Sequence, residues 1–387
     1  MLAGLHTELR RAYAANGRLF ELHADLLHQC DLDCRHCYLD DKARKLPTTD
    51  FWRDVIDQAS ALGVVSLTMS GGEIFLRKDV LELIAHARAR KLFVHLKTHG
   101  GHIDAQLAHR LAELSVSSVS LSYYASDPHV HDHITRRVGS HARTRAALEH
   151  LVRAGVQTIA SCSVMESNRH EWRKVVQDCE ALGVLPRLDG QLHVAHSGDP
   201  FPKRLGLPMH ALVELEAYAL EQRGGSWAPP SAQHVRYAEQ KNCAAGHLAL
   251  YVSPEGDVTP CVTWPMPLGN LARGDTLAGI WASSPALEAI RASRRGDRIL
   301  CRQCEVRSDC DFCAGQAWME TGDPLAAIQN KCRMTRAKTL ARAAALGLPE
   351  PPLPIGLRAD QALEQSARGV HDVLVQLRVP DRAGRSG

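Results

Sequence analysis

Short apolar runs alternate with amphipathic helical patterns between residue 22 and about residue 223. The apolar, strand-like runs begin near Leu22, Val64, Leu92, Val116, Val156 and Val184. The helical stretches between them begin near Thr48, Asp79, Asp104, His141, His170 and Pro208. Strand–helix repeats of this kind specify a parallel sheet with right-handed crossovers. Six units favour an α/β fold built as a partial (β/α)6 TIM-like barrel, with an open doubly wound sheet as the alternative.

The composition changes after Gly224, where Gly-Gly-Ser-Trp-Ala-Pro-Pro is typical of a linker. Seven of the twelve cysteines then lie between Cys243 and Cys332. We therefore predict four parts: an N-terminal extension over residues 1–20, the barrel over 21–225, a small cysteine-rich domain over 226–345 and a tail over 346–387.

The charge pattern gives no reason to expect nucleic acid or an anionic membrane as a partner, because a net charge of +3 is made of interspersed acidic and basic residues. No stretch approaches the eighteen or more apolar residues that a membrane span requires. We expect a cytoplasmic protein. In that reducing compartment, clustered thiols bind metal or carry out chemistry more often than they form disulfides.

Three of these thiols follow the first predicted strand, at Cys30, Cys34 and Cys37. The loops after the carboxyl ends of parallel strands are where such folds place their active sites. Thiolates are soft ligands for zinc or iron-sulfur sites, and three of them on a four-iron cluster leave one iron open. The alternative is a structural zinc site completed by His28 or His36.

The second strand runs directly into Ser70-Gly71-Gly72-Glu73. The two glycines allow the backbone to approach a ligand closely, and the carboxylate of Glu73 can accept hydrogen bonds from an ammonium group. Taken alone, the motif would indicate only a turn that ends a strand.

Taken together, these motifs resemble the radical SAM superfamily: three cysteines spaced by three and two residues, with His36 before the last, followed by Gly-Gly-Glu. In that family the open iron binds S-adenosylmethionine (SAM), and one electron cleaves SAM to methionine and a 5′-deoxyadenosyl radical that abstracts hydrogen from substrate. The resemblance implies a SAM site lined by His36, Gly71, Gly72, Glu73, Thr98 and Ser122. For Thr98 and Ser122, ordinary polar residues at strand ends are the alternative.

The second group of cysteines begins with Cys243 and Cys261, on either side of a turn at Pro254-Glu255-Gly256-Asp257 that predicts a β-hairpin. The remaining members are Cys301, Cys304, Cys310, Cys313 and Cys332. By spacing alone, the seven could form two zinc sites.

The order of these cysteines resembles the SPASM domain, the auxiliary-cluster extension of radical SAM enzymes that modify peptides and proteins. The resemblance implies a nearer cluster on Cys243, Cys261 and Cys313, which lacks one cysteine, and a farther cluster on Cys301, Cys304, Cys310 and Cys332. The chain would then hold three 4Fe-4S clusters, one catalytic and two auxiliary. One departure is that two residues separate Cys310 from Cys313, where the usual pattern has three.

Two further features have competing interpretations. His129, His131 and His133 alternate and would face one way in an extended metal-binding segment, but a loop after the fourth strand is favoured, where the family commonly has a His-Asp pair, an Arg and a Gly-Ser helix start. Cys162 would suit a hydrogen donor to a substrate radical, but burial as a small apolar residue is favoured.

The resemblance implies an enzyme that oxidatively modifies a ribosomally synthesised precursor peptide by crosslinking or epimerisation, with a flavodoxin- or ferredoxin-type electron donor. Small-molecule chemistry in heme or quinone-cofactor maturation is the alternative. A non-enzymatic electron carrier or zinc scaffold is the third class. The sulfatase-maturing branch is disfavoured because Val262, and not Asp, follows Cys261. About twenty residues before the barrel are too few for a separate leader-binding domain.

Overall fold

The computed structural model describes residues 2–39, 41–42, 47–222 and 237–358 of the 387-residue chain. It contains two compact units that do not follow chain order. The first unit comprises residues 1–206, 245–262 and 268–284, and the second comprises residues 207–244, 263–267 and 285–387. The predicted domain boundary near residue 225 and the end of the predicted tail lie outside the described residues.

The first unit is built on a sheet with strand order β6-β5-β4-β3-β2-β1-β7-β8-β9 among its described residues. The six predicted strands form, each parallel to its neighbour, so the prediction of a partial barrel is confirmed. They are β1 Glu21–Leu27, β2 Ser66–Gly71, β3 Phe93–Thr98, β4 Ser118–Ser122, β5 Thr158–Ser163 and β6 Leu185–Asp189.

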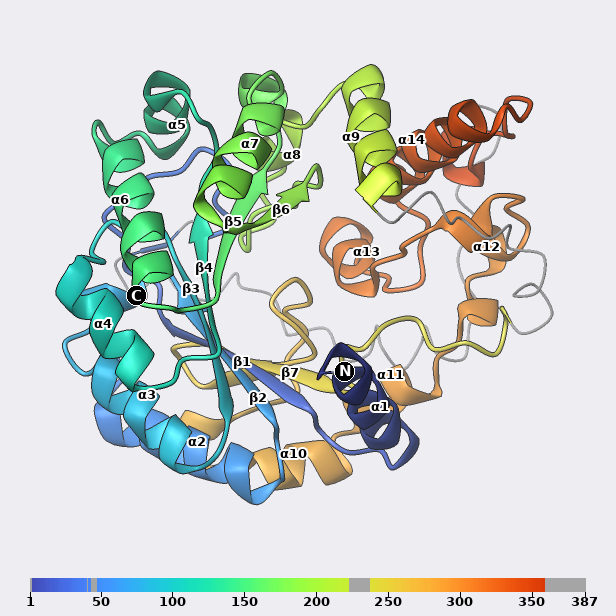
Figure 1. The fold of residues 1–387 in the computed structure, drawn as a ribbon. Helices are drawn as coiled ribbons and strands as arrows, with labels where there is room; N and C mark the ends of the chain where they lie inside the picture. The colour runs from blue at the N-terminus through green and yellow to red at the C-terminus, as the bar shows by residue number, and fades with distance from the viewer. Residues whose placement is uncertain (1, 40, 43–46, 223–236, 359–387) are drawn as a thin grey trace, which may run out of the picture. The chain divides into compact units, whose positions relative to one another are not determined.

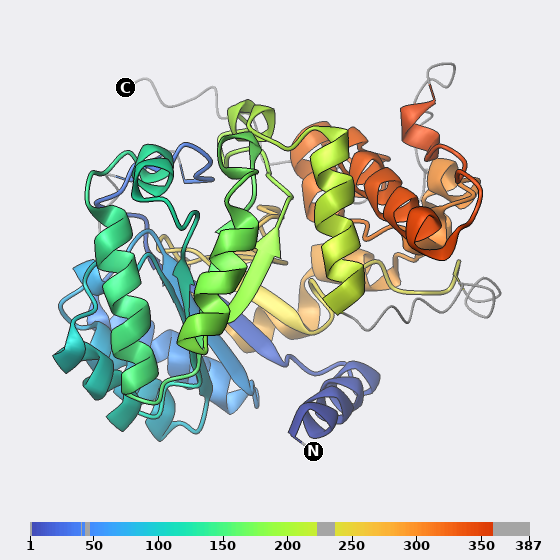
Figure 2. The same cartoon turned by 45° about the horizontal axis from the view of Figure 1, so that its top comes forward.

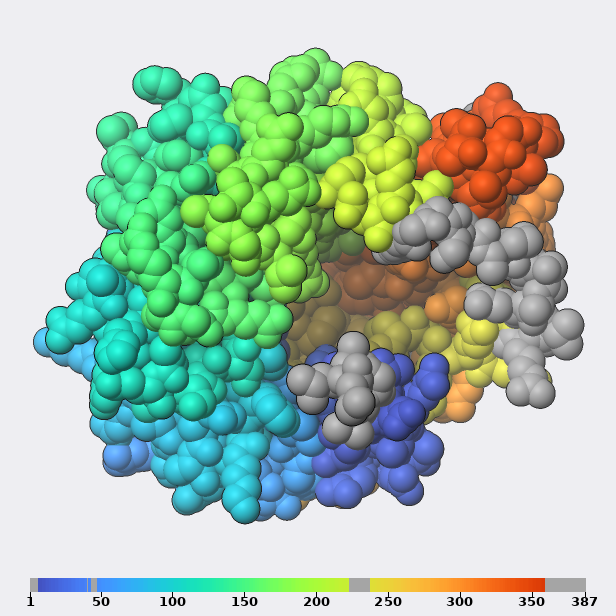
Figure 3. Space-filling view, in the orientation of Figure 1, coloured from blue at the N-terminus to red at the C-terminus, as the bar shows by residue number. Residues whose placement is uncertain are grey.

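The crossover helices lie along the outer face of this sheet (Figure 1). They are α2 Thr49–Ala61, α3 Val80–Ala89, α4 Ala105–Glu113, α6 Ser140–Arg153 and α7 Trp172–Leu182. Each buries one apolar stripe; in α2 the stripe contains Trp52, Val55 and Ile56. Burying each of these large side chains stabilises the fold by about 1.5–3 kcal/mol. The space-filling view shows α6 and α7, in green, as a continuous outer surface (Figure 3).

The predicted hairpin forms as β7 Ala249–Val252 and β8 Asp257–Thr259, which pair antiparallel around a turn in which Gly256 has φ 83°. It extends the barrel sheet, because β7 pairs in parallel with β1. Strand β9 Gly269–Asn270 follows, and helix α10 Leu277–Ser283 packs on α2, where Leu277 N donates to Gln58 Oε1 at 2.8 Å.

Several helices were not predicted from the pattern, among them the following two. The N-terminal extension forms α1 Leu2–Ala15, and the segment predicted as a loop after the fourth strand forms α5 Pro128–Thr135. The loop prediction was wrong because the segment carries a strong local start signal. Asp127 accepts a hydrogen bond from His129 N at 2.7 Å, and Pro128 occupies the first turn.

The remaining short elements of the first unit are α8 Phe201–Arg204 and the 3-10 helices η1 Ile74–Leu76, η2 Glu166–Asn168 and η5 Leu271–Arg273.

The second unit consists of helices and irregular loops. Its helices are α9 Met209–Gln222, α11 Pro285–Ala292, α12 Ile299–Arg302, α13 Ala314–Thr321 and α14 Gln329–Leu346, with 3-10 helices η6 Arg295–Asp297, η7 Arg307–Asp309 and η8 Ile355–Leu357. Helix α14 packs along α9 (Figure 2). Among the described residues of the whole chain, none of the helices combines the length and apolarity needed to cross a bilayer.

Candidate functional site

The first three cysteines lie, partly buried, on the loop that follows β1. The loop is folded by its own backbone: Leu32 N donates to Cys30 Sγ at 3.4 Å, and Cys37 N donates to the carbonyl of Cys34 at 3.1 Å. The three sulfur atoms are therefore presented by one short, turned segment at the carboxyl end of the sheet.

The C-terminal end of α5 holds this loop. Asp33 N and Arg35 N donate to the carbonyls of Thr135 and Ile134, each at 3.1 Å. Carbonyls in the last turn of a helix lack intrahelical partners, so they are free to accept these bonds. The helix that the sequence pattern did not predict thus helps to position the cysteines.

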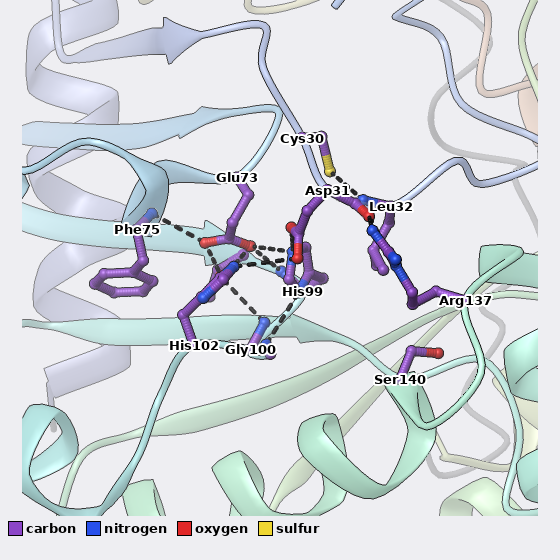
Figure 4. A network of polar contacts seen from close by, with 12 residues as sticks. Cys30, Asp31, Leu32, Glu73, Phe75, His99, Gly100, His102, Arg137 and Ser140 are labelled. Atoms are coloured by element: carbon purple, nitrogen blue, oxygen red, sulfur yellow. Dashed lines mark hydrogen bonds and ion pairs between the residues drawn. The ribbon is translucent and has the colours of Figure 1, made fainter.

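The residues after α5 continue this support. Arg137 donates twice to the Asp31 carbonyl, at 3.2 and 2.7 Å (Figure 4), and Arg136 Nη1 donates to Asp33 at 2.9 Å. The carboxylate of Asp132 caps the start of α6 by accepting hydrogen bonds from Gly139 N, the Ser140 hydroxyl and His141 N. The His-Asp, Arg and Gly-Ser series noted in the sequence therefore ties the cysteine loop to two helices.

The thiols on this loop ionise poorly unless a cation compensates them. Burial raises the pKa of Cys30 to about 11. Burial, together with the neighbouring thiols of Cys37 and Cys30, raises the pKa of Cys34 to about 12. A bound soft metal group would offset this penalty, because its positive charge stabilises thiolates. Three soft donors on one short loop therefore fit a metal or cluster bound by three sulfurs.

A second group beside Cys30 has the geometry of a metal site among the described residues: Cys30 Sγ, an Asp31 carboxylate oxygen and a His99 ring nitrogen lie within 4.8 Å of one another. His99 Nε2 is also 2.8 Å from Asp31 Oδ1 and 3.1 Å from Glu73 Oε2. These distances are typical of charge-assisted hydrogen bonds. The hydrogen bonds account for the closeness of Asp31 and His99 without a bound ion. Asp31 and His99 were not predicted from the sequence, although each directly follows a predicted site residue.

The glycines of the second motif approach β1 more closely than a side chain would allow. Gly71 has φ 130°, and a Cβ there would lie 2.1 Å from the carbonyl oxygen of Leu27. A Cβ on Gly72 would lie 2.1 Å from that of Gln29. Gly72 N and Glu73 N donate to these same carbonyls, each at 2.8 Å. The segment after β2 therefore stays hydrogen-bonded to the segment that connects β1 to Cys30.

The carboxylate of Glu73 is fully buried and held by donors from three residues (Figure 4). The Thr98 hydroxyl lies 2.7 Å from both carboxylate oxygens, and the backbone N–H groups of His99 and Phe75 donate at 3.0 Å each. A buried carboxylate held in this way has a fixed orientation and can pair with an ammonium group. The structure thus brings Thr98 and Glu73, both predicted at the SAM site, into direct contact.

His36 and Ser122 meet at a residue that sequence analysis missed, Tyr124. The His36 and Tyr124 rings pack edge to face with their centroids 4.8 Å apart. Burial lowers the pKa of His36 to about 4, so the ring is neutral at neutral pH. The hydroxyl of Ser122, at the end of β4, hydrogen-bonds to that of Tyr124. Tyr124 follows a predicted strand end by two residues, which was the available signal.

Four cysteines of the second group gather within the second unit. Burial raises the pKa of Cys332 to about 12, with further contributions from the thiols of Cys310, Cys301 and Cys304. The same mutual effect, added to burial, raises the pKa of Cys301 to about 11. The four thiols therefore interact electrostatically with one another inside this unit.

Neighbouring residues contact the sulfur atoms of two of these four cysteines. The Thr335 hydroxyl donates to the Lys331 carbonyl at 2.8 Å and interacts with the neighbouring thiol of Cys310, and Gly356 N–H hydrogen-bonds to Cys332. A Cβ on Gly356 would lie 2.7 Å from Cys332 Sγ, so a larger residue at this position would displace that sulfur.

The other three cysteines of the second group belong to different units. Cys243 and Cys313 lie in the second unit, whereas Cys261 lies in the first, after β8. Cys313 Sγ accepts a hydrogen bond from Gln316 N at 3.5 Å at the start of α13, and the Thr263 hydroxyl lies 4.0 Å from it.

The alternating histidines are not brought together. In helix α5 residues two positions apart face different directions, and His131 is buried whereas His133 Nε2 is 2.8 Å from Arg35. In the part of the chain that is described, no metal-ligand group includes them. Cys162 is buried with its Sγ 3.5 Å from the Tyr124 carbonyl, which agrees with the packing interpretation.

Comparison with known proteins agrees with this geometry. The family model of the radical SAM superfamily matches residues 26–179, and the SPASM model, an iron-sulfur cluster-binding domain, matches residues 243–305. The first family uses a 4Fe-4S cluster and SAM, and the second binds auxiliary iron-sulfur clusters.

Individual relatives cover most of the chain. PqqA peptide cyclase from Methylocella silvestris is 30% identical over 79% of this chain and 85% of that protein. The AdoMet-dependent heme synthase of Methanosarcina barkeri is 26% identical over 78% of this chain and 93% of that protein. The structure of Streptococcus suis SuiB bound to precursor peptide SuiA has the same fold, with a TM-score of 0.63 and 17% identity over 83% of this chain and 78% of that one. This chain belongs to the radical SAM superfamily, as an enzyme that carries a SPASM domain after its barrel.

Proposed function

We propose that this enzyme cleaves SAM reductively and modifies a ribosomally synthesised precursor peptide, either oxidatively, by forming a crosslink, or without net oxidation, by epimerising a residue. The observation that carries the proposal is the 30% identity to PqqA peptide cyclase, which extends over 79% of this chain and 85% of that protein. The fold shared with SuiB, which was solved with a precursor peptide bound, supports the same class of substrate.

Within this proposal, Cys30, Cys34 and Cys37 hold the catalytic 4Fe-4S cluster. Three ligands leave one iron open, and the positive charge of the iron-sulfur core offsets the raised pKa values of Cys30 and Cys34. When bound, the cluster and SAM supply a 5′-deoxyadenosyl radical that abstracts hydrogen from the substrate.

The protein's contribution at this site is to bind and orient SAM. Gly71 and Gly72 bring the backbone close, and the buried Glu73 carboxylate accepts the ammonium group of SAM, with Thr98 fixing its orientation. His36 and Ser122, linked through Tyr124, complete the proposed SAM site.

Two auxiliary clusters bring the proposed total to three. Cys301, Cys304, Cys310 and Cys332 hold the farther one, while Cys243, Cys261 and Cys313 hold the nearer one with a fourth position left for another ligand. Clusters of different potential can pass on the electron that oxidation of the substrate releases. A flavodoxin or ferredoxin delivers the electron for SAM cleavage. Reduced clustered thiols favour the cytoplasm as the place of action.

The test is an anaerobic reaction of the reconstituted enzyme with SAM, a reductant and the precursor peptide encoded beside its gene. We expect deoxyadenosine and a peptide that has lost two hydrogens, or that contains an epimerised residue, by mass spectrometry and chiral amino-acid analysis. Cys34→Ala, which removes one ligand of the first cluster, should abolish both products. Turnover of a small molecule with no change in any peptide would overturn the proposal.

The second candidate is small-molecule chemistry in heme or quinone-cofactor maturation, favoured by the 26% identity to the AdoMet-dependent heme synthase. It predicts SAM cleavage stimulated by a porphyrin or a quinone precursor and not by the peptide. Assaying both kinds of substrate with the same enzyme preparation separates the two candidates.

A further inference from the structure

Arg298 is among the largest fully buried side chains of the described residues, with 1% of its surface exposed. It lies at the N-cap of α12, three residues before Cys301. Arginine is seldom buried unless a carboxylate pairs with it. In the described part of the chain no carboxylate pairs with the Arg298 guanidinium, and its Nε and Nη1 atoms have no hydrogen-bond partner.

The contacts that Arg298 does make are with aromatic residues. Its guanidinium lies 4.0 Å from the centroid of the Phe312 ring, and Nη2 donates to the Tyr237 hydroxyl at 2.7 Å. Such contacts orient a guanidinium but do not neutralise it. An uncompensated charge in a protein interior is strongly unfavourable, so the site calls for an anion.

The groups beside Arg298 that can carry a negative charge are cysteine sulfurs. Arg298 interacts electrostatically with the thiols of Cys301 and Cys310, and Tyr237 interacts with the same two thiols. Lys331 also acts on Cys310. The guanidinium, with Nε and Nη1 unpartnered, is thus buried beside the four-cysteine group and on the same unit of the fold.

We infer that Arg298 is the counter-charge of the auxiliary cluster held by Cys301, Cys304, Cys310 and Cys332, with its unpartnered N–H groups serving the cluster's sulfur atoms. The inference rests on the proposed assignment of that cluster. Reduction adds one negative charge to a cluster, so a fixed, desolvated positive charge stabilises the reduced form and raises the reduction potential. Arg298 therefore makes this cluster a better electron acceptor.

The test compares Arg298→Gln, which removes the charge, with Arg298→Lys, which keeps it. The matched control is Arg302→Gln, since Arg302 is adjacent to Cys301 in sequence but exposed to solvent. All are made in a chain with Cys30, Cys34 and Cys37 replaced by Ala, so that only auxiliary clusters contribute. The readouts are iron content and redox titration followed by electron paramagnetic resonance.

We expect Arg298→Gln to lower the ratio of reduced to oxidised cluster, at a fixed solution potential, about tenfold, which is about 59 mV for a one-electron couple. Arg298→Lys and Arg302→Gln should each change it less than about threefold. If Arg298→Gln instead loses only this cluster while Arg298→Lys retains it, the charge is required for assembly and the inference is supported.

An equal shift in Arg298→Gln and Arg302→Gln, or no shift with full iron content, overturns the role of Arg298 and leaves the cluster assignment intact. Equal loss of the cluster in Arg298→Gln and Arg298→Lys shows a packing role and overturns it too. If Cys304→Ala leaves the iron content unchanged, the proposed cluster assignment fails, and the inference fails with it.

Discussion

The hydroxyl of Thr98 lies 2.7 Å from both carboxylate oxygens of Glu73, and both side chains are buried. Thr98→Val keeps the shape of the side chain but removes this donor. We expect the free energy of unfolding to fall by about 1–3 kcal/mol, because a buried carboxylate loses a partner. SAM should bind about fivefold or more weaker, as measured by isothermal titration calorimetry.

The matched control is Thr158→Val, since Thr158 is also a buried strand threonine but donates to the backbone carbonyl of Val156 at 2.8 Å. It should lose a comparable amount of stability while SAM affinity stays the same. Equal weakening of SAM binding in both variants would show that Thr98 has no specific role in orienting Glu73.

Gly72 provides a sharper test of the SAM site. In Gly72→Ala the new Cβ would meet the Gln29 carbonyl oxygen at 2.1 Å, so the strand must move away from the cysteine loop. We expect deoxyadenosine formation to fall at least about a hundredfold, because displacements of about 1 Å have effects of this size. Gly279→Ala, in α10, is the control, since the atom nearest to the added Cβ would be the Thr276 hydroxyl oxygen at 3.1 Å. If Gly72→Ala cleaved SAM at the wild-type rate, the close approach of Gly72 to the Gln29 carbonyl would not be needed for SAM cleavage.

Asp132 gives a prediction for pH dependence. Burial raises its pKa, but hydrogen bonds from His141 N, the Ser140 hydroxyl and Gly139 N outweigh this, so its pKa lies below the ordinary value. A carboxylate with a lowered pKa stabilises the fold above its unfolded pKa, near 4, and loses that contribution as the pH falls through its folded pKa.

At pH 7, Asp132→Ala should therefore lower the free energy of unfolding by about 1 kcal/mol, as loss of a helix cap does. The difference from wild type should shrink steadily between pH 5 and pH 2, because protonated Asp132 no longer caps α6. Denaturant unfolding of the cluster-free chain, followed by tryptophan fluorescence, measures both. A difference that is constant with pH would contradict the capping role.

The strands could be predicted because their signals are local. Parallel strands that are covered by helices appear in the sequence as short apolar runs. The runs near Leu22 and Val184 accordingly correspond to β1 and β6. The pairing of β7 with β1 could not be predicted, because it joins segments more than two hundred residues apart. The histidine-rich α5 was missed because its role, holding the cysteine loop through the carbonyls of Ile134 and Thr135, depends on tertiary structure.

The site shows the same division. Cysteine spacing and Gly-Gly-Glu are visible in sequence because the chemistry fixes residue types at short intervals. Arg298 gave no signal, because an arginine in sequence is expected to be exposed and only the fold shows that it is buried without a carboxylate. The link between His36 and Ser122 could not be predicted for a similar reason, since in the sequence Tyr124 is indistinguishable from other apolar residues at a strand end.

Gly356 allows a test of the proposed farther auxiliary cluster that leaves every cysteine in place. Its N–H hydrogen-bonds to Cys332, and a Cβ there would lie 2.7 Å from Cys332 Sγ. Gly356→Ala should push this sulfur out of position, because the alanine methyl group would occupy the space that the thiolate needs. Iron should fall from about twelve to about eight atoms per chain.

The first cluster is remote in sequence from this change, so Gly356→Ala should still convert SAM to deoxyadenosine while the yield of modified peptide falls. That split would place the loss after hydrogen abstraction, where the auxiliary clusters are proposed to accept the electron. Gly279→Ala again serves as the control and should keep full iron and both products. If Gly356→Ala keeps about twelve irons and an unchanged product yield, the contact between Gly356 and Cys332 does not position a cluster ligand.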